Sequence, residues 1–181
     1  MYEVELKVPA SLEVVRDRLA DLEAAAVDDV VQEDVYYDAP HRSFAETDEA
    51  VRVRHERDGT DGGAETRLTY KGPLVDDDSK TREEFETGID DVEAIESILS
   101  SLGFSPAATV RKDRERFALD GYTVTLDAVD GVGEFVEVET EAKEADLETA
   151  REGAFAVLER LGLDPDDGIR TSYLEFVLEG E

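Results

Sequence analysis

The stretch Tyr2-Glu3-Val4-Glu5-Leu6-Lys7-Val8 opens the chain with apolar and charged residues in alternation. Because successive side chains of a β-strand point to opposite faces, this pattern predicts a strand with one apolar and one charged face. Six further segments alternate in the same way, which favours a mainly antiparallel sheet. These segments are 50–55, 66–72, 81–87, 110–117, 122–128 and 134–140.

Amphipathic segments between these strands predict helices. Glycine at 103 and at 162 suits the end of two of them, and Ser172 with Glu175 has the spacing of a capping box. The second helix is expected to turn Ile95, Ile98, Leu99 and Leu102 inward. The predicted helices run from Ser11, as N-cap, to Ala25, from Asp91 to Leu102 and from Asp146 to Leu161, with a short fourth beginning at Ser172.

The chain is expected to fold as one α+β domain over residues 1–181, a length that can bury a single core. The segment 56–65 is rich in glycine and predicts a hairpin connection. The segment 73–80, which contains three consecutive aspartates, predicts a charged surface loop.

The chain is strongly acidic, with 48 acidic and 19 basic residues and a formal net charge of −29. This charge argues against binding to nucleic acid or to anionic membranes, because phosphate groups would be repelled. Cysteine is absent, which excludes disulfides and thiolate ligands. The N-terminal residues lack the apolar region of a secretory signal, and no apolar run exceeds five residues, so we expect a cytoplasmic protein.

The surface charge is typical of proteins that work in concentrated salt. Fourteen of the basic residues are Arg and five are Lys. Molar ions, with a Debye length of about 3 Å, screen the repulsion within such a surface. We therefore expect a high-salt cytosol; the alternative is an acidic docking surface for a basic partner.

Positive charge, scarce in this chain, is concentrated on the polar faces of the predicted strands. Neighbouring cations ~6 Å apart repel by about 3 kcal/mol at an effective dielectric of about 20, so they require a polyanion or interleaved carboxylates. The alternative is a solvated sheet face crossed by ordinary salt bridges. Eight of the 19 basic residues are placed in this way: Lys7, Arg52, Arg54, Arg67, Lys71, Arg82, Lys112 and Arg114.

Carboxylates form two matching pairs on the same kind of face. Glu3 and Glu5 project from one strand, and Glu137 and Glu139 from another. All-oxygen clusters suit hard cations such as Mg²⁺ or Mn²⁺. A cation held beside Arg and Lys is general equipment for phosphoryl or nucleotidyl transfer. The residues therefore predict a metal-dependent enzyme that acts on a phosphorylated substrate.

An ordered set of motifs covers nearly the whole chain: EVELK (3–7), AVRVR (50–54), TYKGP (69–73), SKTREEFE (79–86), VRKDRERF (110–117), TLDAVDGVGEFVEVE (125–139) and RTSYLEF (170–176). The first is similar to the E-x-E-x-K signature of the CYTH superfamily, the triphosphate tunnel metalloenzymes. The set resembles the class IV adenylate cyclase branch most closely. The resemblance implies an eight-stranded antiparallel β-tunnel with inward-facing charges, helices packed outside and a triphosphate held within.

The resemblance also implies roles for individual residues. The metal-binding acids would be Glu3, Glu5, Glu137 and Glu139, with Asp127 as a further ligand. Arg82 and Glu84 match a less well-defined pair, and Arg67 is added from strand parity alone. Phe117 stands where relatives often have tyrosine. The phosphate-binding bases would be Lys7, Arg52, Arg54, Lys71, Lys112 and Arg114, of which Lys7, Lys71, Lys112 and Arg114 are the expected catalytic residues.

The same set of residues is compatible with several alternative functions. Attack by a ribose hydroxyl at the α-phosphorus of ATP gives cyclic AMP and pyrophosphate, whereas attack by water makes a triphosphatase, acting on tripolyphosphate, thiamine triphosphate or a nucleotide. A non-catalytic triphosphate-binding module is the third hypothesis. A homodimer is implied by the resemblance alone. His41 is expected to be exposed, His55 to face away from the bases, and Tyr173 either to pack or to close the tunnel mouth.

Overall fold

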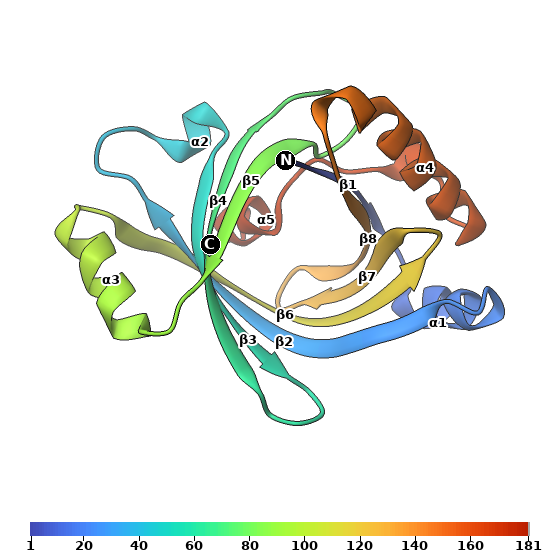
Figure 1. Ribbon diagram of the computed structural model, residues 1–181, viewed down its shortest axis with the longest axis horizontal. Helices are drawn as coiled ribbons and strands as arrows, with labels where there is room; N and C mark the ends of the chain where they lie inside the picture. The colour runs from blue at the N-terminus through green and yellow to red at the C-terminus, as the bar shows by residue number, and fades with distance from the viewer. Residues whose placement is uncertain (181) are drawn as a thin grey trace.

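The computed structural model describes residues 1–180, in which eight strands close into a barrel (Figure 1). The strand order is β1-β5-β4-β3-β2-β6-β7-β8, and every neighbouring pair is antiparallel. The predicted antiparallel tunnel is therefore confirmed. Its strands are β1 (Tyr2–Pro9), β2 (Ala25–Asp38), β3 (Ala50–Asp58), β4 (Ala64–Leu74), β5 (Arg82–Gly88), β6 (Ser105–Leu119), β7 (Tyr122–Val129) and β8 (Gly133–Ala142).

Strand β2 has no counterpart among the seven segments that alternation identified. Its sequence places two aspartates together at 28–29 and two tyrosines together at 36–37, which breaks the period of two. The pairing with β6 shifts register near both doublets, between Ala26 and Asp28 and between Tyr36 and Tyr37. The first shift adds Val27 to β2 as a bulge, whereas the second adds Ala107 to β6, so the strand persists although the doublets hide its alternation. The helix expected to reach Ala25 is wrong at its end, because α1 (Leu12–Asp21) stops before this strand begins.

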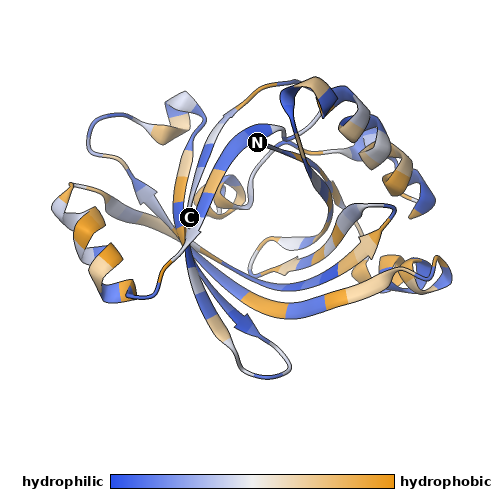
Figure 2. Cartoon of the chain, viewed as in Figure 1, coloured by the Kyte–Doolittle hydropathy of each residue, from blue (hydrophilic) through white to orange (hydrophobic). Residues whose placement is uncertain are grey.

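Helices α1 and α4 (Leu147–Arg160) cover one side of the barrel, and α3 (Val92–Ser101) lies on the other (Figure 1). Apolar residues alternate with polar ones along the strands, and the helices carry apolar stripes (Figure 2). The main core forms where outward strand residues meet α1 and α4. Its fully buried members include Leu6, Val8, Val15, Leu19, Val124, Val136, Val138, Ala154 and Leu158.

Helix α3 buries less of its apolar face than its periodicity predicts. Leu99 packs with Tyr37 and Val53, but Ile98 is 52% exposed and Leu102, just beyond the helix, is 63% exposed. The expectation that Ile98 and Leu102 turn inward is therefore wrong. Periodicity states which residues share a side of a helix, whereas the width of the surface opposite decides how many of them are covered.

The chain ends in α5 (Tyr173–Glu179), which packs on β6 and is preceded by the predicted capping box. The Ser172 Oγ accepts from the backbone N–H of Glu175 at 3.1 Å, and the Glu175 carboxylate accepts from the N–H of Ser172 at 2.6 Å. Short helix α2 (Phe44–Thr47) and two single turns, Glu144–Asp146 and Pro165–Asp167, complete the described elements. Across residues 1–180, the helices are all too short or too polar to cross a membrane.

The segment predicted as a surface loop closes a seam in the barrel. Strand β1 pairs with β5 at Tyr2 and Glu3. Beyond that point the N–H of Lys80 donates to the carbonyl of Glu5, and the N–H of Ile169 to that of Lys7, both at 2.8 Å. Loop residues between β4 and β5 thus continue the ladder, and the prediction is wrong for Lys80, whose side chain enters the barrel.

The packing of α4 on the barrel gives a stability prediction. Leu158 is fully buried between the helix and the strands, so Leu158→Ala should lower the free energy of unfolding by about 2–5 kcal/mol. Val14 of α1 is 65% exposed, and Val14→Ala should change it by less than about 0.5 kcal/mol. Urea unfolding in molar KCl measures both. Equal losses would contradict the assigned buried face.

Candidate active site

The barrel encloses a cavity of about 1050 Å³, lined by the inward faces of its strands and by α2 and α5. Strand register brings bases from four separate strands to this space: Arg54 lies opposite Arg67, and Lys71 opposite Glu84. The predicted bases that line it are Arg52, Arg54, Arg67, Lys71, Arg82, Lys112 and Arg114.

Asp34 of β2 is a buried carboxylate shared by three of these bases. Both of its oxygens accept from Arg54, at 2.6 Å from Nε and 2.7 Å from Nη2. The ammonium of Lys112 lies 3.4 Å from Asp34, and a guanidinium nitrogen of Arg52 lies 3.8 Å away. Asp34 is fully buried, and these three cations hold the pKa of its carboxyl well below the usual range despite burial. Sequence reasoning missed Asp34 because it missed the strand that carries it.

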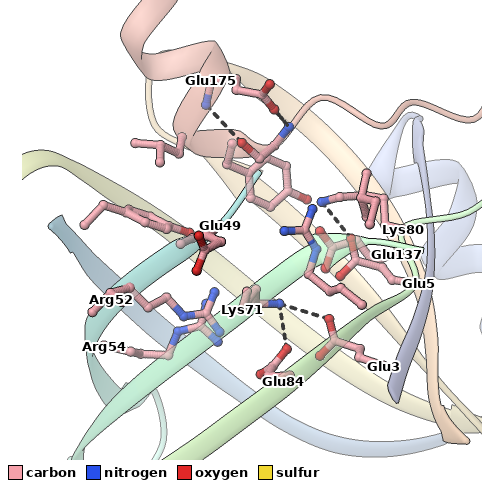
Figure 3. Close-up of a pocket in the computed structure, with 18 of the residues that line it drawn as sticks. Glu3, Glu5, Glu49, Arg52, Arg54, Lys71, Lys80, Glu84, Glu137 and Glu175 are labelled. Atoms are coloured by element: carbon pink, nitrogen blue, oxygen red, sulfur yellow. Dashed lines mark hydrogen bonds and ion pairs between the residues drawn. The ribbon is translucent and has the colours of Figure 1, made fainter. Parts of the chain in front are cut away.

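Arg52 is the cation in this group with hydrogen-bonding capacity to spare. Its guanidinium is buried, and within residues 1–180 its Nε has no hydrogen-bond partner. An unpaired buried donor is unfavourable, so a nitrogen placed at a polar cavity favours binding of an anion. Figure 3 shows Arg52 beside Arg54, on the side of the view opposite Glu3 and Glu5.

The acidic wall is formed by Glu3 and Glu5 of β1 with Glu139 of β8. One carboxylate oxygen of each lies within 4.8 Å of the other two. Burial, followed by the charge of Glu3, raises the pKa of Glu139 to about 8. Burial acts in the same direction on Glu5, but Lys80, Lys71 and Lys7 together lower its pKa far below the usual range.

These three carboxylates fit a hard divalent cation. Mg²⁺ and Mn²⁺ prefer oxygen donors and are commonly held by one to three carboxylates together with water and phosphate oxygens. A carboxyl group whose pKa is raised beside other acids gains stability as an anion when a cation binds between them. Glu3, Glu5 and Glu139 are therefore the residues that would hold the metal.

Two lysines form ion pairs with the carboxylates of the acidic wall. Lys71 of β4 lies 2.9 Å from Glu3 and 2.8 Å from Glu84 of β5, and Figure 3 shows it between these two carboxylates. Lys80, from the seam loop, lies 3.1 Å from Glu5. Strand alternation could not identify Lys80, because it lies in an irregular segment outside any strand.

The remaining predicted acids are engaged by Arg114. Its guanidinium donates to both oxygens of Asp127 and, at 2.9 Å, to Glu137. The hydroxyl of Tyr173 also donates to Asp127, at 2.8 Å. Asp127 and Glu137 are thus placed as partners of a base, while the three-carboxylate group forms without them.

Lys7 lies beneath the start of α5. Its ammonium donates to the carbonyl of Thr171 and lies 4.2 Å from the ring centre of Tyr173. Burial, together with nearby Lys80, lowers its pKa to about 7. Tyr173 itself packs against Phe135 with ring centres 5.2 Å apart, and it also lines the cavity.

Arg67 and Arg82 mark the two ends of the cavity. Arg67 is partly exposed and pairs with Glu65 at 2.7 Å and Glu86 at 3.3 Å. Arg82 donates to the carbonyl of Gly72 at 3.0 Å. His41 is exposed, as expected. A cavity with cations on one side and carboxylates on the other can bind a polyphosphate and a divalent metal together.

Known proteins with a similar sequence and a similar fold exist. The CYTH domain family matches residues 1–173. A protein of Methanocaldococcus jannaschii, whose name proposes an adenylate cyclase, is 37% identical over 177 residues, which is 97% of this chain and 98% of the relative. A solved Pyrococcus horikoshii OT3 structure is 39% identical, with a TM-score of 0.91 and 99% of both chains covered.

A more distant solved structure is that of a Hippeastrum protein described with a dominant triphosphatase activity. It has a TM-score of 0.67 and 18% identity, and covers 99% of this chain and 96% of its own. At this identity the likeness shows the fold alone.

The position of Asp34 predicts a large effect on stability. Asp34→Ala leaves Arg54, Lys112 and Arg52 without their shared anion, and the free energy of unfolding should fall by about 3–5 kcal/mol. Tripolyphosphate should restore part of the loss, because it binds only the folded cations. Thermal unfolding with and without it measures both effects.

The matched control is Asp113→Ala, which removes an exposed carboxylate from the outer face of β6, next to Lys112. A loss at Asp34 no larger than at Asp113 would contradict the structural role of Asp34.

Lys112 predicts a pH effect. Burial lowers its pKa to about 7, so at higher pH much of the free protein carries it neutral. A bound anion favours the charged ammonium and raises that pKa, so anion binding should take up protons between about pH 7 and pH 9. Calorimetry of tripolyphosphate binding with EDTA, in two buffers of different ionisation enthalpy, measures this uptake.

When it binds tripolyphosphate, Lys112→Met should take up fewer protons per bound ligand than the wild type. Protons taken up by the ligand itself are the same for both proteins, so they drop out of this difference. Exposed Lys143→Met is the control and should match the wild type. Equal proton uptake in all three proteins would contradict the assignment to Lys112.

Proposed function

Because this chain belongs to the CYTH domain family, we propose that it is a metal-dependent enzyme that converts ATP to cyclic AMP and pyrophosphate. Members of this family are adenylate cyclases or triphosphatases, and this chain is an enzyme of that kind. One observation carries the choice of substrate class: bases and a three-carboxylate cluster face each other across one cavity. The M. jannaschii relative, named for a cyclase, supports the choice of reaction.

The bases would bind the triphosphate and neutralise its charge. Arg52 contributes a free Nε, and Arg54 is held by Asp34 in a fixed orientation. Arg114 and Lys112 add charge from β6. Because these groups are positioned before substrate arrives, they stabilise the additional charge of the transition state without reorganising. Lys7 would take part only after Thr171 and Tyr173 move away from its ammonium.

Glu3, Glu5 and Glu139 would hold Mg²⁺ or Mn²⁺ on the acidic wall. When bound, such a cation acts as a Lewis acid on phosphate oxygens. Lys71 and Lys80, paired with Glu3 and Glu5, would favour the ionised form of these carboxylates and orient them. Glu84 would orient Lys71 from its other side.

In the cyclase reaction, the ribose 3′-oxygen forms a bond to the α-phosphorus. The bond from that phosphorus to the oxygen of the β-phosphate breaks, pyrophosphate leaves, and the hydroxyl proton passes to solvent. The chain's contribution is to hold the triphosphate extended along its bases so that attacking and leaving oxygens lie in line.

A triphosphatase is the second candidate. The same residues would serve it, with water rather than the ribose hydroxyl as nucleophile. The observation that favours it is that charged side chains line both ends of the cavity, Arg67 and Glu86 at one end and Asp48 and Arg82 at the other, so the lining can bind a phosphate chain along its length without an apolar site for a base. The Hippeastrum protein with the same fold is described with that activity.

The test is to incubate the protein with ATP and Mg²⁺ or Mn²⁺ in molar KCl, because the acidic composition predicts a high-salt protein. Phosphorus NMR identifies the products. Cyclic AMP with pyrophosphate is the expected result. ADP or pyrophosphate with orthophosphate would make the enzyme a triphosphatase, and stabilisation by ATP without turnover would contradict catalysis.

Two arginines of β3 provide a matched pair. Arg52→Ala should raise the KM for ATP by about tenfold to a hundredfold, because a charge-assisted contact with phosphate is lost. Arg57→Ala alters an exposed arginine on the outer face of the same strand and should leave the KM unchanged. Equal effects of the two substitutions would contradict binding inside the barrel.

A further inference from the structure

We propose that Lys80 is an exchangeable counter-ion of the acidic wall: it pairs with Glu5 in the free protein and passes to a phosphate group when the triphosphate binds. Through this exchange, binding of the divalent cation and binding of the triphosphate assist each other. The inference rests on the proposed function and deepens it, because it assigns the coupling between the two ligands to one side chain. Lys80 belongs to the seam loop, residues 75–81, between β4 and β5.

Two of the three carboxylates that would hold the cation are already paired with an ammonium group. The ammonium of Lys80 lies 3.1 Å from Oε1 of Glu5, and that of Lys71 lies 2.9 Å from Oε1 of Glu3. An ammonium group and a divalent cation at the same carboxylate oxygen repel each other. Each lysine therefore competes with the cation for its carboxylate.

The contact between Lys80 and Glu5 is an ion pair without the geometry of a hydrogen bond. Glu5 is buried, and within residues 1–180 its Oε1 has no hydrogen-bond partner. Such an oxygen gains from a cation that approaches it directly. Lys71 and Lys7 also place positive charge near Glu5. The carboxylate can therefore release Lys80 and still be compensated.

Lys80 differs from Lys71 in what it would contact after release. Lys71 also pairs with Glu84, at 2.8 Å, so it keeps a partner if it leaves its first carboxylate. Within residues 1–180, Glu5 is the ion-pair partner of Lys80, whose side chain is only 13% exposed. A largely buried ammonium without an anion is unfavourable. Lys80 therefore requires a new anion once a cation has taken its place.

The cavity offers Lys80 that anion when phosphate is bound. Lys80 lines the cavity, and the ammonium of Lys7 lies close to it. Two neighbouring ammonium groups repel each other, and a phosphate oxygen between them removes this repulsion. The same displacement that opens Glu5 to the cation thus adds a base to the triphosphate.

The backbone of the seam loop fixes the point from which Lys80 reaches. The N–H of Val75 donates to the carbonyl of Thr81 at 2.9 Å and closes the neck of the loop. One carboxylate oxygen of Asp76 accepts from the N–H of Ser79 at 2.7 Å and from its hydroxyl at 3.0 Å. The residue next to Lys80 is therefore held by hydrogen bonds within the loop.

Two arginines from later parts of the chain hold the same loop. Nη2 of Arg170 donates to the carbonyl of Asp76 at 2.8 Å, and the guanidinium of Arg151, on α4, lies 3.7 Å from the Asp76 carboxylate. The backbone thus stays in place, while the lysine side chain has a flexible four-carbon stem that can turn from one partner to another.

The experiment measures the two ligands separately in molar KCl. Mn²⁺ alone is followed by the electron paramagnetic resonance signal of the free ion, and tripolyphosphate with EDTA by calorimetry. In Lys80→Met, the Kd for Mn²⁺ should fall about tenfold, because the competing ammonium is gone. The Kd for tripolyphosphate should rise about tenfold, because a charge-assisted contact is lost. Damage to the fold would weaken both ligands, so opposite changes are specific to the exchange.

A second set of variants tests the loop. Asp76→Ala removes the acceptor for Ser79, and both constants should change in the same directions as in Lys80→Met, by about threefold. Asp76→Asn keeps an oxygen that accepts from Ser79 and should stay within about twofold of the wild type. Asp77→Ala alters the exposed neighbour in the same loop and should change neither constant.

Weaker binding of both ligands in Lys80→Met would overturn the inference and make Lys80 structural. Any result in which only one ligand responds, or neither, would also overturn it, because the exchange requires both. Binding of both ligands by the wild type without turnover would contradict the proposed catalysis and not the coupling. If the wild type binds neither ligand, the proposed function is wrong and this inference falls with it.

Discussion

The structure depends on balancing charges inside a closed barrel. Arg54, Lys112 and Arg52 lie around one buried carboxylate, Asp34, and Arg114 is held by Asp127 and Glu137. A buried charge without a partner is strongly unfavourable, so each cation requires an acid on a neighbouring strand. The barrel provides these acids through register, because cross-strand neighbours on the inward face come from different parts of the chain.

The inside and outside of the barrel follow opposite rules. Outside, apolar strand residues pack against α1 and α4 and make a rigid wall. Inside, the cations near Arg52 are not fully paired, because the Nε of Arg52 has no hydrogen-bond partner within residues 1–180. Near Glu139 the acids are in excess, and burial together with neighbouring carboxylates raises its pKa. Each local imbalance favours a ligand of the missing charge, an anion at the first place and a metal at the second. The two requirements together describe a metal–phosphate complex.

Much of the site was predictable from alternation, since a period of two assigns each charged residue to a face without knowledge of its neighbours. That Arg52 and Arg54 share one polar face, and Glu3 and Glu5 another, followed from that rule, whereas the turning of these faces into a tunnel was implied by the family resemblance alone. Asp34 did not follow from alternation, because polar residues occupy both faces of β2, as exposed Glu33 between buried Gln32 and Asp34 shows, so the strand has no legible alternation. Lys80 did not either, because it is delivered by a loop whose backbone completes the seam beside β1.

The sequence by itself therefore determined which residues face the tunnel wherever strands are regular, and which chemistry those residues favour. Tertiary structure decided how they are grouped: that Glu3 and Glu5 meet Glu139, that Asp127 pairs with Arg114, and that α5 lies over Lys7. Face and chemistry are local properties of a strand, whereas grouping depends on register and on helices returning from distant parts of the chain.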